Sequence, residues 1–338
     1  NDYMKKINKN ILFTYIILIC SLAGCSSNNY SGYNKTDISK NVIPDSIRAK
    51  QVSDLKFGMF ICWSFSTFSG NEWTTVAPYP AYFRATTCNT DQWCRTAKNA
   101  GMNYILFLAK HHDGFCLWDT KTTDLKVTNA PLGKDVVEMV RKSCSKYGLK
   151  LALYFSEGDW TWPGAERGKH NMGGYNPEMK KAQLEELLTE YGPIEFIWFD
   201  RAAGDGGLSH DETTAWVNQL QPNCLVGYNH GDPSGRLSIG EMGNPGPVKQ
   251  KGNTNYLAAE FTYPILPPHK GGANWFYSLP EHDNLCHPAS KIFSDYQGAI
   301  QHGNIFSLNV GPNYEGLIRE IDVKTLQEVG KMITNNKK

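Results

Sequence analysis

The first candidate for chemistry in this chain is an aspartate at the end of an apolar run. Residues 194–200 read IEFIWFD, six mostly apolar positions followed by the carboxylate of Asp200. Such continuous hydrophobicity is typical of a parallel β-strand buried on both faces, and it would place Asp200 at the carboxyl end of that strand. Barrel enzymes carry their catalytic groups there. A single strand-end aspartate is equally compatible with opening a turn or capping a helix, so the other strand ends must decide.

Other strand-like runs end in residues of the same chemical kinds. Glu72 and Trp73 follow the first such run, His111 and His112 follow the second, and Tyr154 lies near the end of the third. In a barrel these ends meet on one face. Later strand ends and turns add Asn229, His230, Arg236, Glu241, Glu260 and Trp275. The whole set predicts a funnel of aromatic rings, histidines and carboxylates.

The two adjacent histidines have three possible uses. They could bind a metal ion, but neighbouring residues at a strand end seldom point at one ion, and no second pair lies at ligand spacing. They could also be structural residues of the core. We favour hydrogen bonding to vicinal hydroxyls, because a neutral imidazole offers one donor and one acceptor in fixed directions.

The carboxylates favour glycoside hydrolysis, which requires two of them around one glycosidic oxygen. One protonates the leaving group, and the other attacks the anomeric carbon or activates water. Asp200 is the predicted nucleophile, because a strand end holds it rigidly. The acid/base partner needs a raised pKa and must come from a different loop. Glu241 and Glu260 compete for this role, with Glu157 and Glu72 behind them.

Eight short apolar runs must position these groups, at residues 57–63, 103–109, 149–156, 194–200, 224–228, 237–241, 257–261 and 304–309. Amphipathic segments predict helices at residues 90–100, 134–147, 177–191 and 211–220, after Pro288, and at 320–333. Repeated βα units imply parallel pairing, and eight of them favour an α/β fold, a (β/α)8 TIM-like barrel forming a single catalytic domain over residues 52–338. An open doubly wound sheet is the alternative, but no glycine-rich nucleotide-binding motif follows the first strand.

Composition limits the classes of partner. The chain has 338 residues, of which 41% are hydrophobic, enough for a sizeable core. Its formal net charge of +1 provides no global field to attract nucleic acid or an anionic membrane surface. The cysteines form no CxxC pair, and none has histidines at ligand spacing. We therefore predict no structural metal, no cofactor and no obligatory disulfide framework.

The N-terminal residues 1–25 have the pattern of a lipoprotein signal peptide. Three lysines precede an apolar run at residues 11–22, and the sequence LAGC ends with Cys25, which resembles a bacterial lipobox. A membrane anchor helix is the alternative, but the run is short for a span. Residues 26–51 are predicted to form a polar tether. These features predict an exported lipoprotein of the bacterial cell envelope, held at the membrane only through a lipid on Cys25.

From about residue 55 to residue 333 the sequence resembles the α-L-fucosidases of glycoside hydrolase family 29. The motifs that carry the resemblance are FGMFICWSFSTFSGNEW, AKHHDGFCLWDTKTTDLKV, LALYFSEGDW, YGPIEFIWFD, GRLSIGEMG, AEFTYPI, NWFYSLPE and IFSLNVGPNYEGLI. The resemblance implies an irregular (β/α)8 barrel and metal-free hydrolysis with retention. It also implies an oligosaccharide or glycoconjugate substrate that ends in L-fucose or a related sugar.

The resemblance assigns roles to individual positions. Asp200 matches the family nucleophile, and His111 and His112 match the paired histidines that hold sugar hydroxyls. Positions that match further residues of the pocket wall are Glu72, Trp73 and Tyr154. Trp275, in the NWFY motif, is a further candidate for substrate binding.

One motif points to a branch of the family, and two positions depart from the family pattern. GRLSIGEMG is similar to a segment of the 1,3/1,4-linkage-specific branch, which implies Glu241 as acid/base, with Arg236 near its loop and Glu260 as second choice. Cys62 stands where the first-strand motif carries histidine, so a pocket that admits a 6-hydroxyl, and hence an α-L-galactosidase, is an alternative. Arg201 replaces a glycine and could contact an acidic or sulfated substrate. An inactive glycan-binding lipoprotein is the other alternative.

Overall fold

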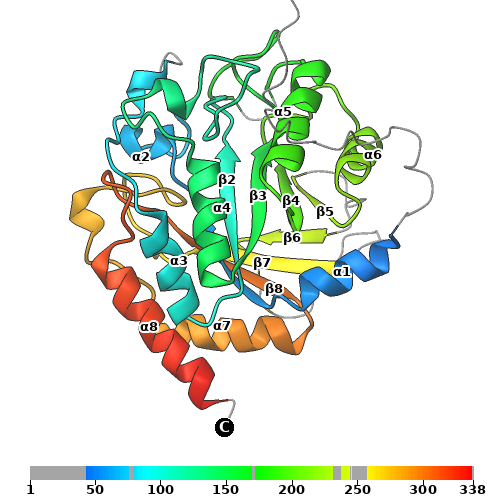
Figure 1. Ribbon diagram of the computed structural model, residues 1–338. Coiled ribbons are helices and arrows are strands. Elements are labelled where there is room, and N and C mark those ends of the chain that lie inside the picture. Colours follow the sequence, from blue (N-terminus) through cyan, green and yellow to red (C-terminus); the bar gives the residue numbers. More distant parts are fainter. Residues whose placement is uncertain are drawn as a thin grey trace, which may run out of the picture. The chain divides into compact units, whose positions relative to one another are not determined.

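Eight parallel strands close into a barrel in the described part of the chain (Figure 1). The computed structural model describes residues 43–75, 79–169, 172–230, 237–243, 245 and 257–336. The strands are β1 (Phe57–Ile61), β2 (Tyr104–Lys110), β3 (Lys150–Ser156), β4 (Phe196–Asp200), β5 (Leu225–Asn229), β6 (Leu237–Glu241), β7 (Ala258–Pro264) and β8 (Ile305–Val310). Each strand pairs with its neighbour in sequence, and β8 pairs with β1, so the predicted (β/α)8 barrel is confirmed.

Helices flank the strands on the outside of the barrel, as predicted. They are α1 (Asp45–Ser53), α2 (Phe65–Ser69), α3 (Thr90–Asn99), α4 (Val136–Tyr147), α5 (Pro177–Glu190), α6 (His210–Leu220), α7 (Ala289–Gln301) and α8 (Glu320–Asn335), with short 3-10 turns η2 (Pro80–Tyr82), η3 (Val127–Asn129) and η4 (Pro280–His282). Side chains that accept hydrogen bonds from first-turn amides fix where four of the helices begin; these caps are Asn89, Asp135, Asn176 and Ser209. None of the helices within the described ranges has the length and apolar composition needed to cross a bilayer.

The barrel domain begins earlier than the sequence predicted. Residues 45–51, assigned to a tether over 26–51, form most of α1, which packs near β5 and β7. Arg48 on its buried face donates a hydrogen bond to the carbonyl of Pro222. The polar composition hid this helix, because only its inner face is buried. The predicted signal peptide and lipid anchor, residues 1–25, lie outside the described residues.

Strand β6 differs from the other seven strands in its burial and pairing. All residues of β1, β2, β4, β5, β7 and β8 are buried, whereas only the first residue of β6 is. Among the described residues, the pairing of β6 with β5 has one register pair, Gly227 with Leu237, whereas β6 pairs with β7 along five residues. The barrel therefore has a tightly built side around β4 and a looser side at β6.

Candidate active site

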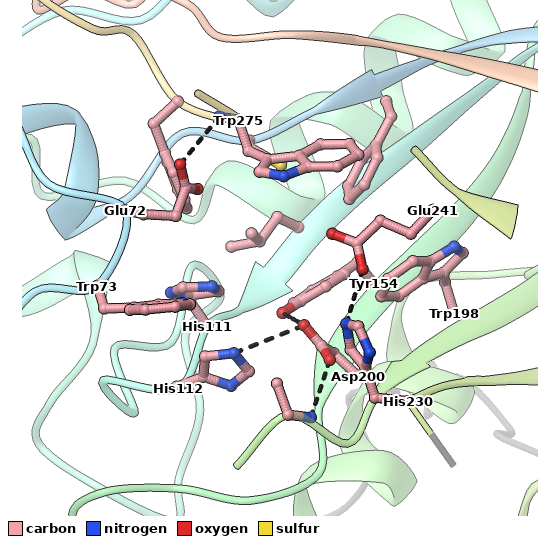
Figure 2. Close-up of a pocket in the computed structure, with 15 residues that line it drawn as sticks. Glu72, Trp73, His111, His112, Tyr154, Trp198, Asp200, His230, Glu241 and Trp275 are labelled. Atoms are coloured by element: carbon pink, nitrogen blue, oxygen red, sulfur yellow. Dashed lines mark hydrogen bonds and ion pairs between the residues drawn. The ribbon is translucent and has the colours of Figure 1, made fainter. Parts of the chain in front are cut away.

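A pocket with an empty volume of about 510 Å³, part of it open to solvent, lies at the carboxyl ends of the strands (Figure 2). Barrel enzymes carry their sites at this face. Of the ten residues predicted for the site, eight line the pocket: Glu72, Trp73, His111, His112, Tyr154, Asp200, Glu241 and Trp275. The fold thus brings together side chains that lie up to about two hundred residues apart in sequence.

Asp200 is the last residue of β4, and its carboxylate is held from several sides (Figure 2). Its Oδ2 accepts a hydrogen bond from the Tyr154 hydroxyl at 2.7 Å, and its Oδ1 accepts one from the Ala202 amide at 3.0 Å. His112 Nε2 lies 3.5 Å from Oδ2. Burial raises the pKa of Asp200, and the hydrogen bonds from Tyr154 and Ala202 oppose that rise. The result is an oriented carboxylate that can act as a nucleophile.

A hydrogen-bond chain fixes how the His112 ring presents its nitrogens. Nδ1 lies 2.6 Å from the Ser156 hydroxyl, which donates its own proton to the carbonyl of Gly158 at 2.6 Å. Because a hydroxyl has one proton, Nδ1 must donate to Ser156. Nε2 therefore faces Asp200 and the pocket. When neutral it can accept a hydrogen bond from a sugar hydroxyl, and when protonated it can donate one.

His111 offers a different group to a ligand. Burial lowers its pKa well below the usual range, so the ring is neutral. In the described part of the chain its buried Nδ1 has no hydrogen-bond partner. A buried polar atom without a partner at a pocket wall favours a ligand that supplies one. The predicted role of the paired histidines in holding hydroxyls fits this geometry.

Glu241 is the last residue of β6 and lines the pocket. Its Oε2 accepts a hydrogen bond from Asn229 Nδ2 at 2.7 Å, and His230 Nε2 lies 2.7 Å from the same oxygen. Repulsion from Glu241 contributes to the raised pKa of Asp200, so the two carboxylates influence each other. Two carboxylates from different strands therefore share one pocket, as glycoside hydrolysis requires.

Glu72 and the tryptophans build the outer wall. Glu72 accepts hydrogen bonds from the backbone amides of Asn274 at 2.7 Å and Trp275 at 3.2 Å, which joins the loop after α2 to the loop after β7. Burial raises the pKa of Glu72 to about 7. The Trp275 ring packs against Phe60, with ring centroids 5.9 Å apart. Trp73, with an exposed fraction of 38%, presents its ring to solvent at the pocket. Such rings can stack on sugar faces.

Glu260, predicted as a second candidate for acid/base, does not line the pocket. It is fully buried on β7, and its Oε2 accepts a hydrogen bond at 2.6 Å from Trp198 Nε1. The strand register explains the difference: Glu241 pairs with Thr262, whereas Glu260 lies two residues earlier on β7, deeper in the barrel. Burial raises the pKa of Glu260 to about 7. Its carboxyl therefore supports Trp198, which stacks on Tyr154 with ring centroids 5.1 Å apart.

The charged side chain after Asp200 also points away from the pocket. Arg201 Nε lies 3.6 Å from Glu157 Oε2, and its terminal nitrogen lies 3.1 Å from Asp205 Oδ2. Glu157 is fully buried and contacts Lys180 Nζ at 2.5 Å, so it belongs to this ion cluster and not to the pocket. The predicted contact of Arg201 with an acidic substrate has no support here. Arg236, the remaining predicted residue, lies outside the described residues.

Cys62 and His230 also line the pocket, although neither was among the ten predicted site residues. Cys62 lines the pocket as a neutral thiol, because burial raises its pKa well above the usual range. His230 lines the pocket and contacts Glu241. Its position just after β5, like that of His111 after β2, is the feature of the sequence that could have identified it as a site residue. Across the described ranges no three histidine, cysteine or acidic side chains are grouped as a metal site would need.

Comparisons with known proteins point to one enzyme family. A model of the α-L-fucosidase family matches residues 22–338. α-L-Fucosidase 1 of Arabidopsis thaliana is 31% identical over 303 residues, which cover 81% of this chain and 57% of the relative. A putative α-L-fucosidase 1 of Oryza sativa is 29% identical over 306 residues, covering 82% and 56%. The chain thus spans about half the length of the curated relatives it matches.

Solved structures give the same answer. A glycoside hydrolase 29 family member from an unknown rumen bacterium superposes with a TM-score of 0.72 at 29% identity, covering 85% of this chain and 56% of the other. α-L-Fucosidase isoenzyme 1 from Paenibacillus thiaminolyticus superposes with a TM-score of 0.73 at 26% identity, covering 87% and 76%. The barrel, the motifs and the family match coincide, and the chain belongs to the α-L-fucosidase family, glycoside hydrolase family 29.

Proposed function

We propose that this protein is a retaining exo-α-L-fucosidase that removes terminal α-L-fucose from glycans. The observation that carries the proposal is the placement of two carboxylates, Asp200 and Glu241, in one pocket lined by histidines and aromatic rings. A pocket suits a terminal sugar better than an internal one, because it encloses one ring. Family membership supports the choice of fucose.

The proposed reaction has two steps. In the first, Asp200 attacks the anomeric carbon while Glu241 gives a proton to the departing glycosidic oxygen. In the second, ionised Glu241 takes a proton from water, and this water displaces Asp200 from the sugar. Two displacements at one carbon give net retention. The hydrogen bonds from Tyr154 and Ala202 to Asp200 keep its carboxylate oriented for both steps.

We infer that the enzyme prefers 1,3 and 1,4 linkages. The support is the similarity of GRLSIGEMG to the corresponding segment of that branch, with Glu241 as acid/base and Arg236 beside its loop. The test is hydrolysis of matched trisaccharides that carry fucose in α-1,2, α-1,3 or α-1,4 linkage. Release from the α-1,2 compound at an equal or higher rate would contradict this inference.

The decisive test of the activity is hydrolysis of para-nitrophenyl α-L-fucoside, para-nitrophenyl α-L-galactoside and a fucosylated trisaccharide, with Asp200→Asn as control. We expect release of fucose that disappears in the variant. Galactose release in its place would identify an α-L-galactosidase, whose extra hydroxyl would lie near Cys62. Binding without turnover of all three compounds would identify a glycan-binding protein.

We propose further that the protein is an exported lipoprotein of the bacterial cell envelope. The support is the sequence pattern of residues 1–25, in which three lysines, an apolar run and LAGC lead to Cys25. The test is metabolic labelling with a palmitate analogue of the full chain expressed in bacteria, beside Cys25→Ser. Label and membrane association that vanish in the variant would support the anchor, and an unlabelled wild-type chain would refute it.

A further inference from the structure

His230 adopts an unusual backbone conformation next to the proposed acid/base. It follows β5 with a φ of 54°, and the described residues include two other non-glycine positions with positive φ, Lys56 and Met242. Two of these three positions therefore adjoin Glu241, since Met242 follows it directly. Strained backbone of this kind persists where surrounding structure holds it, and it often marks a functional site. Here it directs the imidazole toward Glu241 (Figure 2).

The contact between the two side chains is short and accessible to water. His230 Nε2 lies 2.7 Å from Glu241 Oε2, and the two side chains have exposed fractions of 52% and 24%. Asn229 Nδ2 donates to the same oxygen at 2.7 Å. An amide neither gains nor loses a proton near neutral pH, whereas an imidazole does. His230 is thus a titratable partner of this carboxyl that can exchange protons with solvent.

We propose that His230 and Glu241 share one proton and titrate as a pair, so that His230 keeps the acid/base supplied with its proton at higher pH than a carboxyl alone could. This inference rests on the proposed function, because it takes Glu241 as acid/base. The shared proton resides either on the second oxygen of Glu241, Oε1, or on the far nitrogen of the His230 ring, Nδ1. It passes between these two atoms through solvent water, which reaches both side chains. In both cases Nε2–H remains bonded to Oε2.

The proton balance of such a pair closes over one catalytic cycle. In the first step the shared proton leaves Glu241 for the glycosidic oxygen as the bond to the anomeric carbon breaks, and a bond to Asp200 forms. The pair is then one proton short, and neutral His230 donates Nε2–H to the carboxylate. In the second step Glu241 takes a proton from the attacking water, which restores the pair. No proton enters or leaves the overall reaction.

The charges around the pair favour a retained proton. The hydrogen bond to Glu241 is the main cause that raises the pKa of His230, and the charges of Glu241 and Asp200 add to it. Other titratable side chains that interact electrostatically with Glu241 are Cys62, Glu72, Tyr154, Asp200 and Glu260. All of these stay in place when His230 is replaced, so a changed pH profile reports on His230 itself.

The test is the pH dependence of kcat/KM for a fucosylated trisaccharide, measured with the wild-type chain and with His230→Gln. A glutamine amide can donate the same hydrogen bond to Glu241 but cannot take up a proton, so it separates position from titration. We expect the alkaline limb of the Gln variant to move to lower pH by about one unit. His230→Asn, whose shorter amide does not reach Glu241 equally well, serves as a second variant should the first fold poorly.

Three results are possible, and each decides the matter. A limb that moves to lower pH supports the shared proton. An alkaline limb that does not move means that His230 only positions Glu241. An alkaline limb that moves to higher pH means that His230 acts as a cation that lowers the pKa of Glu241. Either result overturns the proposal. α-L-Fucosyl fluoride, which needs no acid, is the control, and its limb should not shift. Absence of fluoride hydrolysis by the wild-type chain would instead refute the proposed function.

Discussion

The two sides of the pocket hold their carboxylates in different ways. On one side, β4 is buried along its whole length and pairs with β3 and β5 over four and five residues, and the Asp200 side chain has an exposed fraction of 11%. On the other side, β6 has one buried residue and one register pair with β5, and the Glu241 side chain has an exposed fraction of 24%.

This difference matches the two kinds of chemistry. A nucleophile must keep one orientation relative to the anomeric carbon, because a small misplacement raises the barrier steeply. A rigid strand with backbone and tyrosine donors provides that orientation. An acid/base gives its proton to the leaving group and regains one from the attacking water in each cycle, so water must reach it. A partly exposed carboxyl on a less buried strand, beside a titratable imidazole, provides that exchange.

Removing the charge of Asp200, on the β4 side of the pocket, should have the largest effect. We expect Asp200→Asn to lower kcat by about 10³-fold or more, because an amide cannot form the sugar ester while Tyr154 and Ala202 still hold it in place. Thermal unfolding should confirm an intact fold. Turnover within tenfold of the wild type would mean that the nucleophile lies elsewhere.

Removing the proton donor on the exposed side should have a smaller and more selective effect. We expect Glu241→Gln to lower kcat/KM about 10²-fold for a fucosylated glycan but less than tenfold for a dinitrophenyl fucoside, whose leaving group needs no proton. Azide should raise turnover of the activated substrate and yield α-L-fucosyl azide, because it displaces Asp200 from the intermediate. Equal losses on both substrates, without an azide product, would contradict the assignment.

The barrel and the rigid side of the pocket could be predicted from the sequence. Runs such as IEFIWFD are continuous because both faces of their strands are buried, and a polar residue at the end of such a run lies at the face of the barrel that carries the pocket. Asp200, His111 and His112 follow this rule. The residues alone left Glu241 and Glu260 competing, and only the family resemblance favoured Glu241. Depth in a barrel depends on register between strands, which local sequence does not record.

Contacts between side chains that are not neighbours in sequence could not be predicted either. Arg201, which replaces the family's glycine after Asp200, was considered a possible contact for an acidic or sulfated substrate. Its cation pairs with Glu157, which comes from the loop after β3, and with Asp205. The contact of His230 with Glu241 also joins two residues that are not neighbours in sequence, at the ends of the consecutive strands β5 and β6. Such pairs form only after the chain has folded, so spacing along the sequence could not reveal them.

A glutamate-to-glutamine substitution at Glu260, which lies deeper in the barrel than Glu241, should affect stability more than catalysis. Glu260→Gln keeps an oxygen that accepts from Trp198, so we expect kcat/KM to fall less than tenfold, in contrast to Glu241→Gln. Its main effect should be on stability. The folded-state pKa of about 7 exceeds the ordinary value of 4.5, so the folded protein binds more protons than the unfolded chain between these pH values.

Wild-type stability should therefore fall as pH rises from about 4.5 to 7, and the variant should lose on the order of 1–3 kcal/mol less over this window. Denaturant unfolding at both pH values measures the difference. The groups Glu72, Asp113 and Glu157 also have pKa values raised to about 7, but they are present in both proteins and cancel in the comparison. An identical pH dependence in both proteins would refute a raised pKa for Glu260.

The smallest effect should come from the cation beside the nucleophile. Arg201 forms ion pairs with Glu157 and Asp205 and does not line the pocket. Neither a neutral nor a sulfated fucoside bound in the pocket would therefore contact its guanidinium directly. Without the Arg201 cation, the buried Glu157 keeps Lys180 as its partner at 2.5 Å, so the cluster beside β4 stays charge-paired. We expect Arg201→Gln to change kcat/KM by less than about threefold on both substrates. A loss confined to the sulfated substrate would show that the side chain turns into the pocket when an anion binds, and the contrast between a rigid and an adaptable side would then no longer hold.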